Sequence, residues 1–311
     1  MNPLILDTDG GVDDAQALLM LLANGRAPAA ITTVFGNVPL DQASANILAV
    51  LGVAGAAIPV HAGAERPLVQ EPVHAQEIHG EDGLGGAPRP DAVAEIAGRD
   101  APGVLCAAAS EAAARGGRVD LLMIGPLTNL ALALRRDPAI AAGIGHVTIM
   151  GGTLNGRGNV TPAAEFNIYA DPEAAAIVFR AGLEATLVPW EACTSHVIDG
   201  AALDAMLEAV PDSALRRFGK ALGDHTRRTH VARGGGDVME YVDPLAAAVL
   251  IEPGIVTGAL EASVDVALSA GITRGMTVVD PSGRLGTRKL RVVETVDRAA
   301  VHGIYRRSLG G

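Results

Sequence analysis

The chain has 311 residues, of which 49% are hydrophobic and 19% charged, and its formal net charge is −11. It is long enough to bury a large core, and its acidic balance argues against a nucleic-acid or anionic-membrane partner, because both require basic surface. The two cysteines, Cys106 and Cys193, exclude a disulfide framework and a cysteine-based zinc site. No signal peptide or membrane-spanning run is visible, so we expect a soluble, cytoplasmic protein without a membrane partner.

Short apolar runs alternate with longer helical stretches along most of the chain. Strands that alternate with helices need crossover connections and therefore form a parallel sheet, and nearly continuous apolar strands indicate that both faces are covered. We predict an α/β fold: an open, mostly parallel, Rossmann-like sheet with helices on both faces, in a single domain spanning 1–311. The predicted strands are 4–6, 31–34, 119–124, 146–150 and 186–189, and the predicted helices are 13–24, 40–51, 128–136 and 171–181.

Three segments depart from this alternation and are predicted to be long irregular loops. Residues 62–90 are rich in Gly, Pro and His, residues 151–170 are rich in Gly and Asn, and residues 223–240 are polar. Long loops in a compact domain are usually functional or mobile. The end of the chain, from about Val264, is predicted to form several short strands.

Four carboxylates, Asp7, Asp9, Asp13 and Asp14, lie within eight residues directly after the first predicted strand. Helix capping explains one or two of them, because Asp is favoured at a helix N-terminus. Four like charges this close repel each other unless something positive lies among them, and no Lys or Arg is near in sequence. Either a distant Arg or a dication fills that place, and Ca²⁺ suits a flexible cage of carboxylate oxygens.

Two further segments contribute candidate ligands for such a cage. Asp243 precedes Pro244 at the start of an apolar helix, an arrangement that is common as ordinary helix capping. The segment 124–129 follows a strand and turns into a helix, so that its backbone carbonyls can face the same edge of the sheet. Each has an ordinary structural explanation when taken alone.

These segments together resemble the inosine-uridine preferring nucleoside hydrolases. The octet Asp7–Asp14 is similar to the signature DTDPGxDD of that family, with Gly10 where relatives usually have Pro and with Asp7 expected behind the ligands. The resemblance spans about Leu4 to Leu250. It recurs in family order at 35–38, 125–129, 150–152 and 159–173.

The resemblance implies that a tightly bound Ca²⁺ supports hydrolysis of the N-glycosidic bond of ribonucleosides, giving ribose and a free base. By the family pattern, Asp9, Asp14, Asp243 and the carbonyl of Ile124 hold the metal. Asp9 is also the expected general base, which takes a proton from a Ca²⁺-bound water that Asn37 helps to orient. The family further implies a homodimer or homotetramer and a small-molecule ribonucleoside substrate.

The same pattern assigns the ribose contacts. Asp13 and Asn167 are expected to bind the 2′-hydroxyl, and Asn159 and Glu165 the 5′-hydroxyl, while Met150 lines the ribose pocket. Groups matched to hydroxyls reject deoxyribose, since a missing hydroxyl leaves buried partners unpaired. Cleavage passes through an oxocarbenium-like ribose, whose positive charge a carboxylate-rich pocket stabilises.

The leaving-group side departs from the family. Val242 stands where many relatives have a His that acts near the leaving base, so the proton must come from elsewhere. His79 is the candidate, because its loop 78–86 matches a family loop that covers the base; a solvent-exposed loop histidine is the alternative. The positions that can also enter the pocket are Trp190, Arg228, His230 and Tyr241.

Two other functions stay open. A catalytically silent nucleoside or ribose binder would keep the ribose and metal ligands but would lack a general acid. The valine at position 242, where many relatives have a His, fits this alternative. An Asp-x-Asp phosphatase would use Asp7 and Asp9, but it needs a downstream Lys, and neither Lys220 nor Lys289 lies in a suitable motif. The sequence does not indicate which base is preferred.

Overall fold

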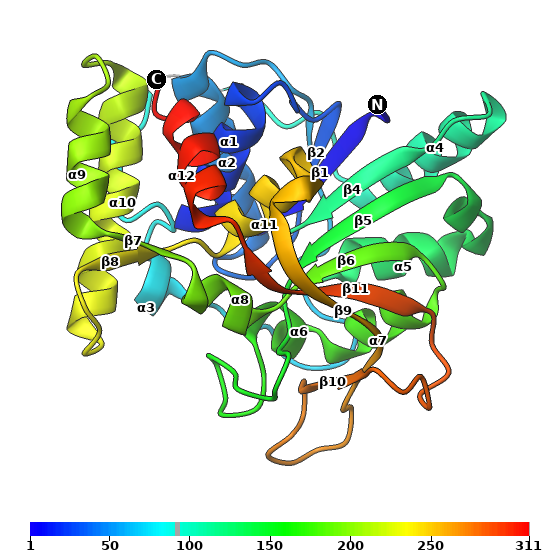
Figure 1. Ribbon diagram of the computed structural model, residues 1–311. Coiled ribbons are helices and arrows are strands. Elements are labelled where there is room, and N and C mark those ends of the chain that lie inside the picture. Colours follow the sequence, from blue (N-terminus) through cyan, green and yellow to red (C-terminus); the bar gives the residue numbers. More distant parts are fainter. Residues whose placement is uncertain (91–93, 311) are drawn as a thin grey trace.

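The computed structural model describes residues 1–90 and 94–310. A nine-stranded sheet with the order β10-β9-β11-β6-β5-β4-β1-β2-β3 lies at its centre, and a separate hairpin pairs β7 with β8 (Figure 1). The strands are β1 Leu4–Thr8, β2 Ala30–Thr33, β3 Val60–Ala62, β4 Val119–Met123, β5 Ile144–Met150, β6 Glu184–Val188, β7 Val197–Asp199, β8 Val238–Glu240, β9 Val256–Val266, β10 Thr277–Asp280 and β11 Lys289–Val296.

Every neighbouring pair from β3 to β11 is parallel, and β9 and β10 run antiparallel to their neighbours. The parallel strands need crossover helices, which the chain supplies between them. The helices are α1 Val12–Ala23, α2 Leu40–Ala54, α3 Gln76–His79, α4 Ala101–Ala114, α5 Thr128–Arg136, α6 Phe166–Ala170, α7 Pro172–Arg180, α8 Trp190–Ser195, α9 Gly200–Glu208, α10 Ala214–Ala232, α11 Asp243–Ile251 and α12 Arg298–Arg307, with short 3₁₀ helices at Pro138–Ala142 and Pro253–Ile255.

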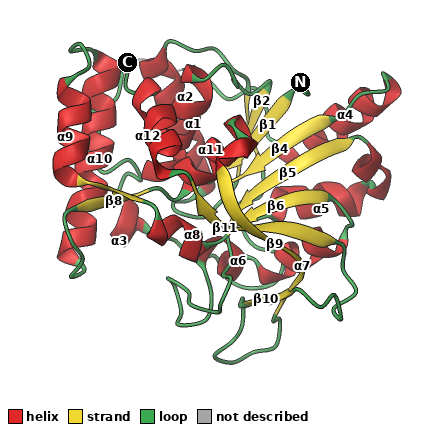
Figure 2. Ribbon diagram, viewed as in Figure 1, coloured by secondary structure: helices red, strands yellow, loops and turns green. Residues whose placement is uncertain are grey.

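Helices cover both faces of the sheet, as Figure 2 shows. On one face α1, α2, α11 and α12 pack into a core that includes Leu18, Ile47 and Val301. On the other face α4, α5 and α7 pack into a second core that includes Leu105, Leu130 and Phe179. All five residues of β1 are buried, as expected for a strand covered on both sides. The predicted fold class is therefore confirmed.

Most of the predicted elements are also confirmed. The predicted helix at 128–136 coincides with α5, and the predicted strands and other helices along 4–189 agree with the structure to within a few residues. Ends of this kind vary by one or two residues with any definition. The segments 62–90 and 151–170 are largely irregular, interrupted only by β3, α3 and α6.

The prediction of an irregular loop at 223–240 is wrong. The structure continues α10 through Ala232 and then forms β8. The helix is amphipathic, with Phe218 and Leu222 buried and most of its charged side chains turned outward, and its polar composition hides this pattern. The prediction for the end of the chain is correct for its strands but misses α12, and β9 begins earlier, at Val256.

The topology brings distant segments to one edge of the sheet. Because β1, β2, β4 and β5 are neighbours and parallel, the turns after them meet at their carboxyl ends, where ligands bind in open sheets of this kind. Among the described helices, none combines the length and the apolar character needed to cross a membrane.

Candidate active site

Two glycines shape the turn between β1 and α1. Gly10 has a φ of +71°, a conformation that L residues rarely adopt and that the ring of a proline cannot reach. A Cβ on Gly11 would lie 2.5 Å from Nδ2 of Asn37 and 2.7 Å from Nδ1 of His79. Gly11 therefore permits three segments of the chain to meet at the start of α1. Its N–H donates to Oδ2 of Asp14 at 2.8 Å.

Three carboxylates from two elements gather at this turn; Asp14 and Asp243 are buried and Asp13 is partly exposed. Oxygens of Asp13, Asp14 and Asp243 all lie within 4.8 Å of one another, and Oδ1 of Asp13 has no hydrogen-bond partner. Burial, and then repulsion from Asp13 and Asp14, hold the pKa of Asp243 well above its usual range. Among the described residues no Lys or Arg forms an ion pair with the cluster, and Nδ1 of His79 lies 3.6 Å from Oδ1 of Asp13. This crowding of unneutralised oxygens fits a hard divalent cation.

Asp9 lies directly beside this cluster. Asn37 donates to Asp9 through both its backbone N–H, at 2.8 Å, and its Nδ2, at 3.0 Å, and the same Nδ2 donates to Asp14 at 3.1 Å. The pKa of Asp9 is raised by burial and by the charge of Asp14. Of the predicted ligands, the structure thus gathers Asp14 and Asp243 most closely, with Asp13 as their third member and Asp9 joined to them by Asn37.

The ends of β4 and β5 contribute the next wall of the site. The side-chain amide of Asn167 donates to the carbonyls of Ile124, at 3.2 Å, and Met150, at 3.3 Å. Asn167 is buried at the start of α6, more than forty residues along the chain from Ile124. The predicted metal-binding carbonyl and two predicted ribose contacts therefore lie together.

Glu165 caps α6 and fastens the loop that precedes it. Its carboxylate accepts from the N–H groups of Gly152, Asn167 and Ile168 at 2.7–3.2 Å. Burial raises its pKa to about 7. Asn159, the other residue predicted at the 5′-hydroxyl, accepts from the N–H of Phe166 at 2.9 Å. Backbone donors thus fix both side chains before any substrate binds.

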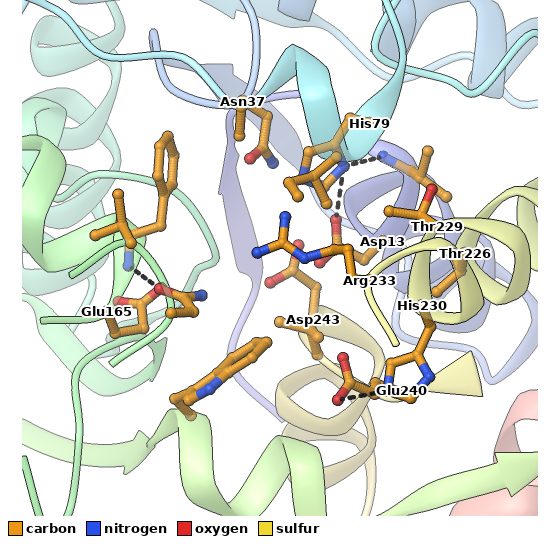
Figure 3. Close-up of a pocket in the computed structure, with 18 of the residues that line it drawn as sticks. Asp13, Asn37, His79, Glu165, Thr226, Thr229, His230, Arg233, Glu240 and Asp243 are labelled. Atoms are coloured by element: carbon orange, nitrogen blue, oxygen red, sulfur yellow. Dashed lines mark hydrogen bonds and ion pairs between the residues drawn. The ribbon is translucent and has the colours of Figure 1, made fainter. Parts of the chain in front are cut away.

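All these segments line one pocket of about 510 Å³ (Figure 3). Asp13 and Asp243 lie in its middle, with Glu165 on one side and side chains of α10 on the other. We call the wall formed by Asn37, Ile124, Met150, Asn159, Glu165 and Asn167 the ribose half. We call the wall formed by Glu77, Ile78, His79, His225, Thr226, Thr229, His230, Arg233, Glu240 and Val242 the leaving-group half.

Residues 4–303 match the model of the family described as inosine-uridine preferring nucleoside hydrolase. The chain belongs to this family. It is 34% identical over 312 residues to the pyrimidine-specific ribonucleoside hydrolase RihA of Shewanella woodyi, which covers 99% of this chain and 98% of that protein. It is 39% identical over 290 residues to the non-specific ribonucleoside hydrolase RihC of Shigella boydii, with 91% and 90% covered.

Solved structures of nucleoside hydrolases have the same fold. A plant nucleoside hydrolase matches with a TM-score of 0.88 and 31% identity over 99% of this chain and 98% of that chain. An inosine-guanosine nucleoside hydrolase matches with a TM-score of 0.89 and 30% identity over the same shares. The protein is therefore an enzyme with ribonucleoside hydrolase activity, which acts on N-glycosyl bonds.

His79 of this nucleoside hydrolase is buried in α3 and lines the pocket, so it is not a solvent-exposed loop histidine. Its Nδ1 accepts the N–H of Val12 at 3.1 Å and lies 3.6 Å from Oδ1 of Asp13. A nitrogen that accepts carries no proton, which leaves Nε2 as the donor of a neutral ring. Burial lowers the pKa of His79 to about 4, in agreement with a neutral ring.

Of the four other residues that were candidates to enter the pocket of the nucleoside hydrolase, two line it and two do not. Trp190 lines the pocket and also packs against the core, and His230 lines the leaving-group half. Arg228 is exposed on α10 and is absent from the pocket wall. Tyr241 is fully buried and stacks edge-on against Tyr305 at 5.3 Å, so it packs rather than facing the pocket.

Several residues of the leaving-group half were not predicted from the sequence: Thr226, Thr229, Arg233 and Glu240. The first three recur at helical spacing along α10 together with His230, and that period is the signal that would have found them. Glu240 belongs to β8 and reaches the pocket only because the hairpin folds back, which no local pattern indicates.

The two lysines considered for a phosphatase lie away from the pocket wall of the nucleoside hydrolase. Lys220 pairs with Asp224 on α10 at 2.6 Å, and Lys289 donates to the carbonyl of Pro281 at 2.8 Å. Neither can neutralise a phosphoryl group beside Asp9. The geometry gives the phosphatase alternative no support.

Proposed function

We propose that this nucleoside hydrolase uses Ca²⁺ to hydrolyse ribonucleosides to ribose and a free base. The observation that carries the proposal is the meeting of Asp13, Asp14 and Asp243 in one cluster that faces Glu165 and Asn167 across the same pocket. Among the described residues no Lys or Arg forms an ion pair with these carboxylates, and hard oxygen donors of this kind suit Ca²⁺. The fixed polar groups on the opposite wall suit the hydroxyls of a ribose.

The proposed ligands are Asp9, Asp14, Asp243 and the carbonyl of Ile124, with Asp13 next to them. A divalent cation held there would orient the attacking water and lower its pKa. Asp9 then takes the proton of that water. The two hydrogen bonds from Asn37 hold the Asp9 carboxylate in place, while burial and the Asp14 charge raise its affinity for a proton.

The ribose half is proposed to bind the sugar through its hydroxyl groups. The free Oδ1 of Asp13 accepts the 2′-hydroxyl, and Asn167 binds the same hydroxyl. Asn159 and Glu165 bind the 5′-hydroxyl, and Met150 packs against the ring. As the glycosidic bond lengthens, the carboxylates around C1′ stabilise the positive charge that develops on the sugar.

His79 is proposed to act from the leaving-group half as a neutral hydrogen-bond donor. Its Nδ1 is occupied by the N–H of Val12, so Nε2–H is the group available to a ligand. This role orients the substrate beside Asp13 and does not require a charged imidazole.

The test is a panel of inosine, adenosine, uridine, cytidine and p-nitrophenyl riboside, assayed before and after treatment with a chelator. We expect hydrolysis of ribonucleosides, its loss on chelation and its recovery with Ca²⁺, and much weaker activity on 2′-deoxyribonucleosides. Turnover that is unaffected by complete removal of metal would contradict the role of Ca²⁺. Binding of nucleosides without any turnover would instead support the silent binder.

The names of the relatives differ in the base they mention, from pyrimidine-specific to purine-preferring, so the same panel decides the preference of this chain. We expect a homodimer or homotetramer, which light scattering of the purified protein would measure.

A further inference from the structure

The leaving-group half lacks an obvious proton donor. Val242, directly before Asp243, is apolar and lines the pocket. His79 accepts the N–H of Val12 and is neutral in this arrangement. His225 is engaged as well, because its Nε2 binds the carbonyl of Ile78 at 2.8 Å and so fastens α3 to α10. A departing purine or pyrimidine anion is a poor leaving group in water, so the wall around it should supply a proton.

His230 differs from these two histidines. Its Nδ1 lies 2.8 Å from the carbonyl of Gly236, which fixes Nδ1–H as the donor to that oxygen. Its Nε2 lies 3.7 Å from Oε1 of Glu240. That separation is too long for a hydrogen bond but short enough for a strong charge interaction, so Nε2–H is not used up by Glu240. Figure 3 shows the pair at the pocket wall, on the far side of Asp243 from Glu165.

Charged and titratable side chains surround His230 in the pocket wall. Burial raises the pKa of Glu240 above its usual value. The nearby His230 and Arg233 act in the opposite direction, because a positive charge favours the carboxylate form. Of the described side chains that line the pocket, five are carboxylic acids and one is an arginine, Arg233. The titratable groups that line the pocket with His230 are Asp13, Glu77, His79, Glu165, His225, Arg233, Glu240 and Asp243.

We propose that His230 is the general acid that protonates the departing base, and that Glu240, whose Oε1 lies 3.7 Å from Nε2 of His230, is its positioning residue. This inference rests on the proposed ribonucleoside hydrolase reaction. It identifies a proton donor for the departing base, which the apolar side chain of Val242 cannot supply. Among the pocket histidines that the structure describes, His230 is the one that donates to a carbonyl through one ring nitrogen and has a carboxylate beside the other.

The step balances with these groups alone. The bond between C1′ and the base nitrogen breaks, and its electron pair stays with the base. The Nε2 proton of His230 passes to an acceptor atom of the base, while water adds its hydroxyl to C1′ and gives its other proton to Asp9. His230 is left neutral, and solvent at the partly exposed pair restores its proton.

The test compares wild type with His230→Gln and Glu240→Gln on inosine, uridine and p-nitrophenyl riboside across pH 5 to 9. A nitrophenolate leaves without a proton, so this substrate reports the ribose machinery and the correct folding of each variant. His146→Gln is the matched control, because His146 is half-exposed on β5 and absent from this pocket.

We expect His230→Gln to lower kcat/KM on the natural nucleosides by about 10²-fold or more and to change turnover of p-nitrophenyl riboside by less than about threefold. The fall in kcat/KM with rising pH, which reports loss of the acid's proton, should disappear in this variant. In Glu240→Gln that fall should move to lower pH, because removing a carboxylate makes the imidazolium a stronger acid.

Equal losses on both kinds of substrate in His230→Gln, or no loss on either, would overturn the assignment. An unmoved pH profile in Glu240→Gln would overturn the role of Glu240. A wild type that cleaves only p-nitrophenyl riboside would also exclude an acid in this pocket while leaving the ribosyl hydrolysis intact. A wild type that cleaves neither substrate would refute the proposed function itself, so the two failures are distinguishable.

Discussion

The ribose half and the leaving-group half of the pocket are built from different parts of the fold. The ribose half consists of turns at the carboxyl ends of β2, β4 and β5 and the loop before α6, and backbone donors fix its side chains. The leaving-group half consists of the one-turn helix α3, the outer helix α10 and the hairpin of β7 and β8. Here side chains are held mainly by one hydrogen bond each to a backbone carbonyl, as His225 is by Ile78 and His230 by Gly236.

This difference has a physical consequence. A turn anchored by neighbouring strands of a central sheet can hold a carboxylate or an amide within a narrow range of positions, which transition-state stabilisation requires. Residues on the surface of a helix at the edge of the fold can be substituted without disturbing the core. We therefore expect the sugar chemistry to depend on the rigid half, and recognition and protonation of the base to depend on the half whose residues can vary.

The largest expected effect is at the centre of the pocket. Asp243→Asn should lower kcat/KM by about 10³-fold on inosine and on p-nitrophenyl riboside alike, because it removes a proposed charged metal ligand on which both reactions would depend. The same variant should lose the increase in Tm that Ca²⁺ gives the wild type, since a cation bound only by the folded state stabilises it.

Asp212→Asn is the control for this variant, because Asp212 is an exposed carboxylate that pairs with Arg217 at 2.6 Å. It should keep both the activity and the response to Ca²⁺. If Asp243→Asn retained its thermal response to Ca²⁺, the metal would be bound elsewhere.

The next effect separates contacts within the ribose half. Asn167→Ala and Glu165→Ala should each weaken the transition state by about 2–4 kcal/mol on both kinds of substrate, since a buried partner is left unpaired. The loss in Asn167→Ala should shrink on 2′-deoxyinosine, and that in Glu165→Ala on 5′-deoxyinosine, because the hydroxyl in question is already absent.

Asn155→Ala offers a matched control, since Asn155 is exposed in the loop that precedes α6. Its steady-state constants should equal those of the wild type. Unchanged kcat/KM in both ribose-half variants would show that this loop does not hold the sugar.

A smaller effect is expected at the boundary of the two halves. His79→Ala should reduce kcat/KM about tenfold on nucleosides and on p-nitrophenyl riboside, because a neutral donor beside Asp13 orients the substrate and does not protonate the base. Parallel steady-state measurements on both substrates decide this. A loss confined to nucleosides would transfer the acid role from His230 to His79.

The smallest effect is a gain. Val242→His, placed in the His230→Gln background, should restore nucleoside turnover about tenfold without changing hydrolysis of p-nitrophenyl riboside, because it returns a titratable ring to the leaving-group half. The measurement is the ratio of kcat/KM on uridine to that on p-nitrophenyl riboside. A ratio equal to that of His230→Gln would show that position 242 does not reach the base.

The sequence by itself determined the α/β class and most elements along 4–189, while the residues of the ribose half were predicted from the family resemblance. These features are local: a β-branched run makes a strand, and the octet Asp7–Asp14 concentrates its charges in a single turn. Local composition misled where it hid a periodicity, as in α10, whose buried face rests on a few apolar residues such as Phe218 and Leu222.

Only the tertiary structure decided which distant groups meet. Asp243 follows Asp14 by more than two hundred residues, and their oxygens come within 4.8 Å because α11 packs beside α1. Glu240 reaches His230 because β8 pairs with β7, and the tautomer of His79 depends on the N–H of Val12. Such contacts follow from chain topology and packing, which no short stretch of sequence encodes, and they decide which ring nitrogen of each pocket histidine is engaged.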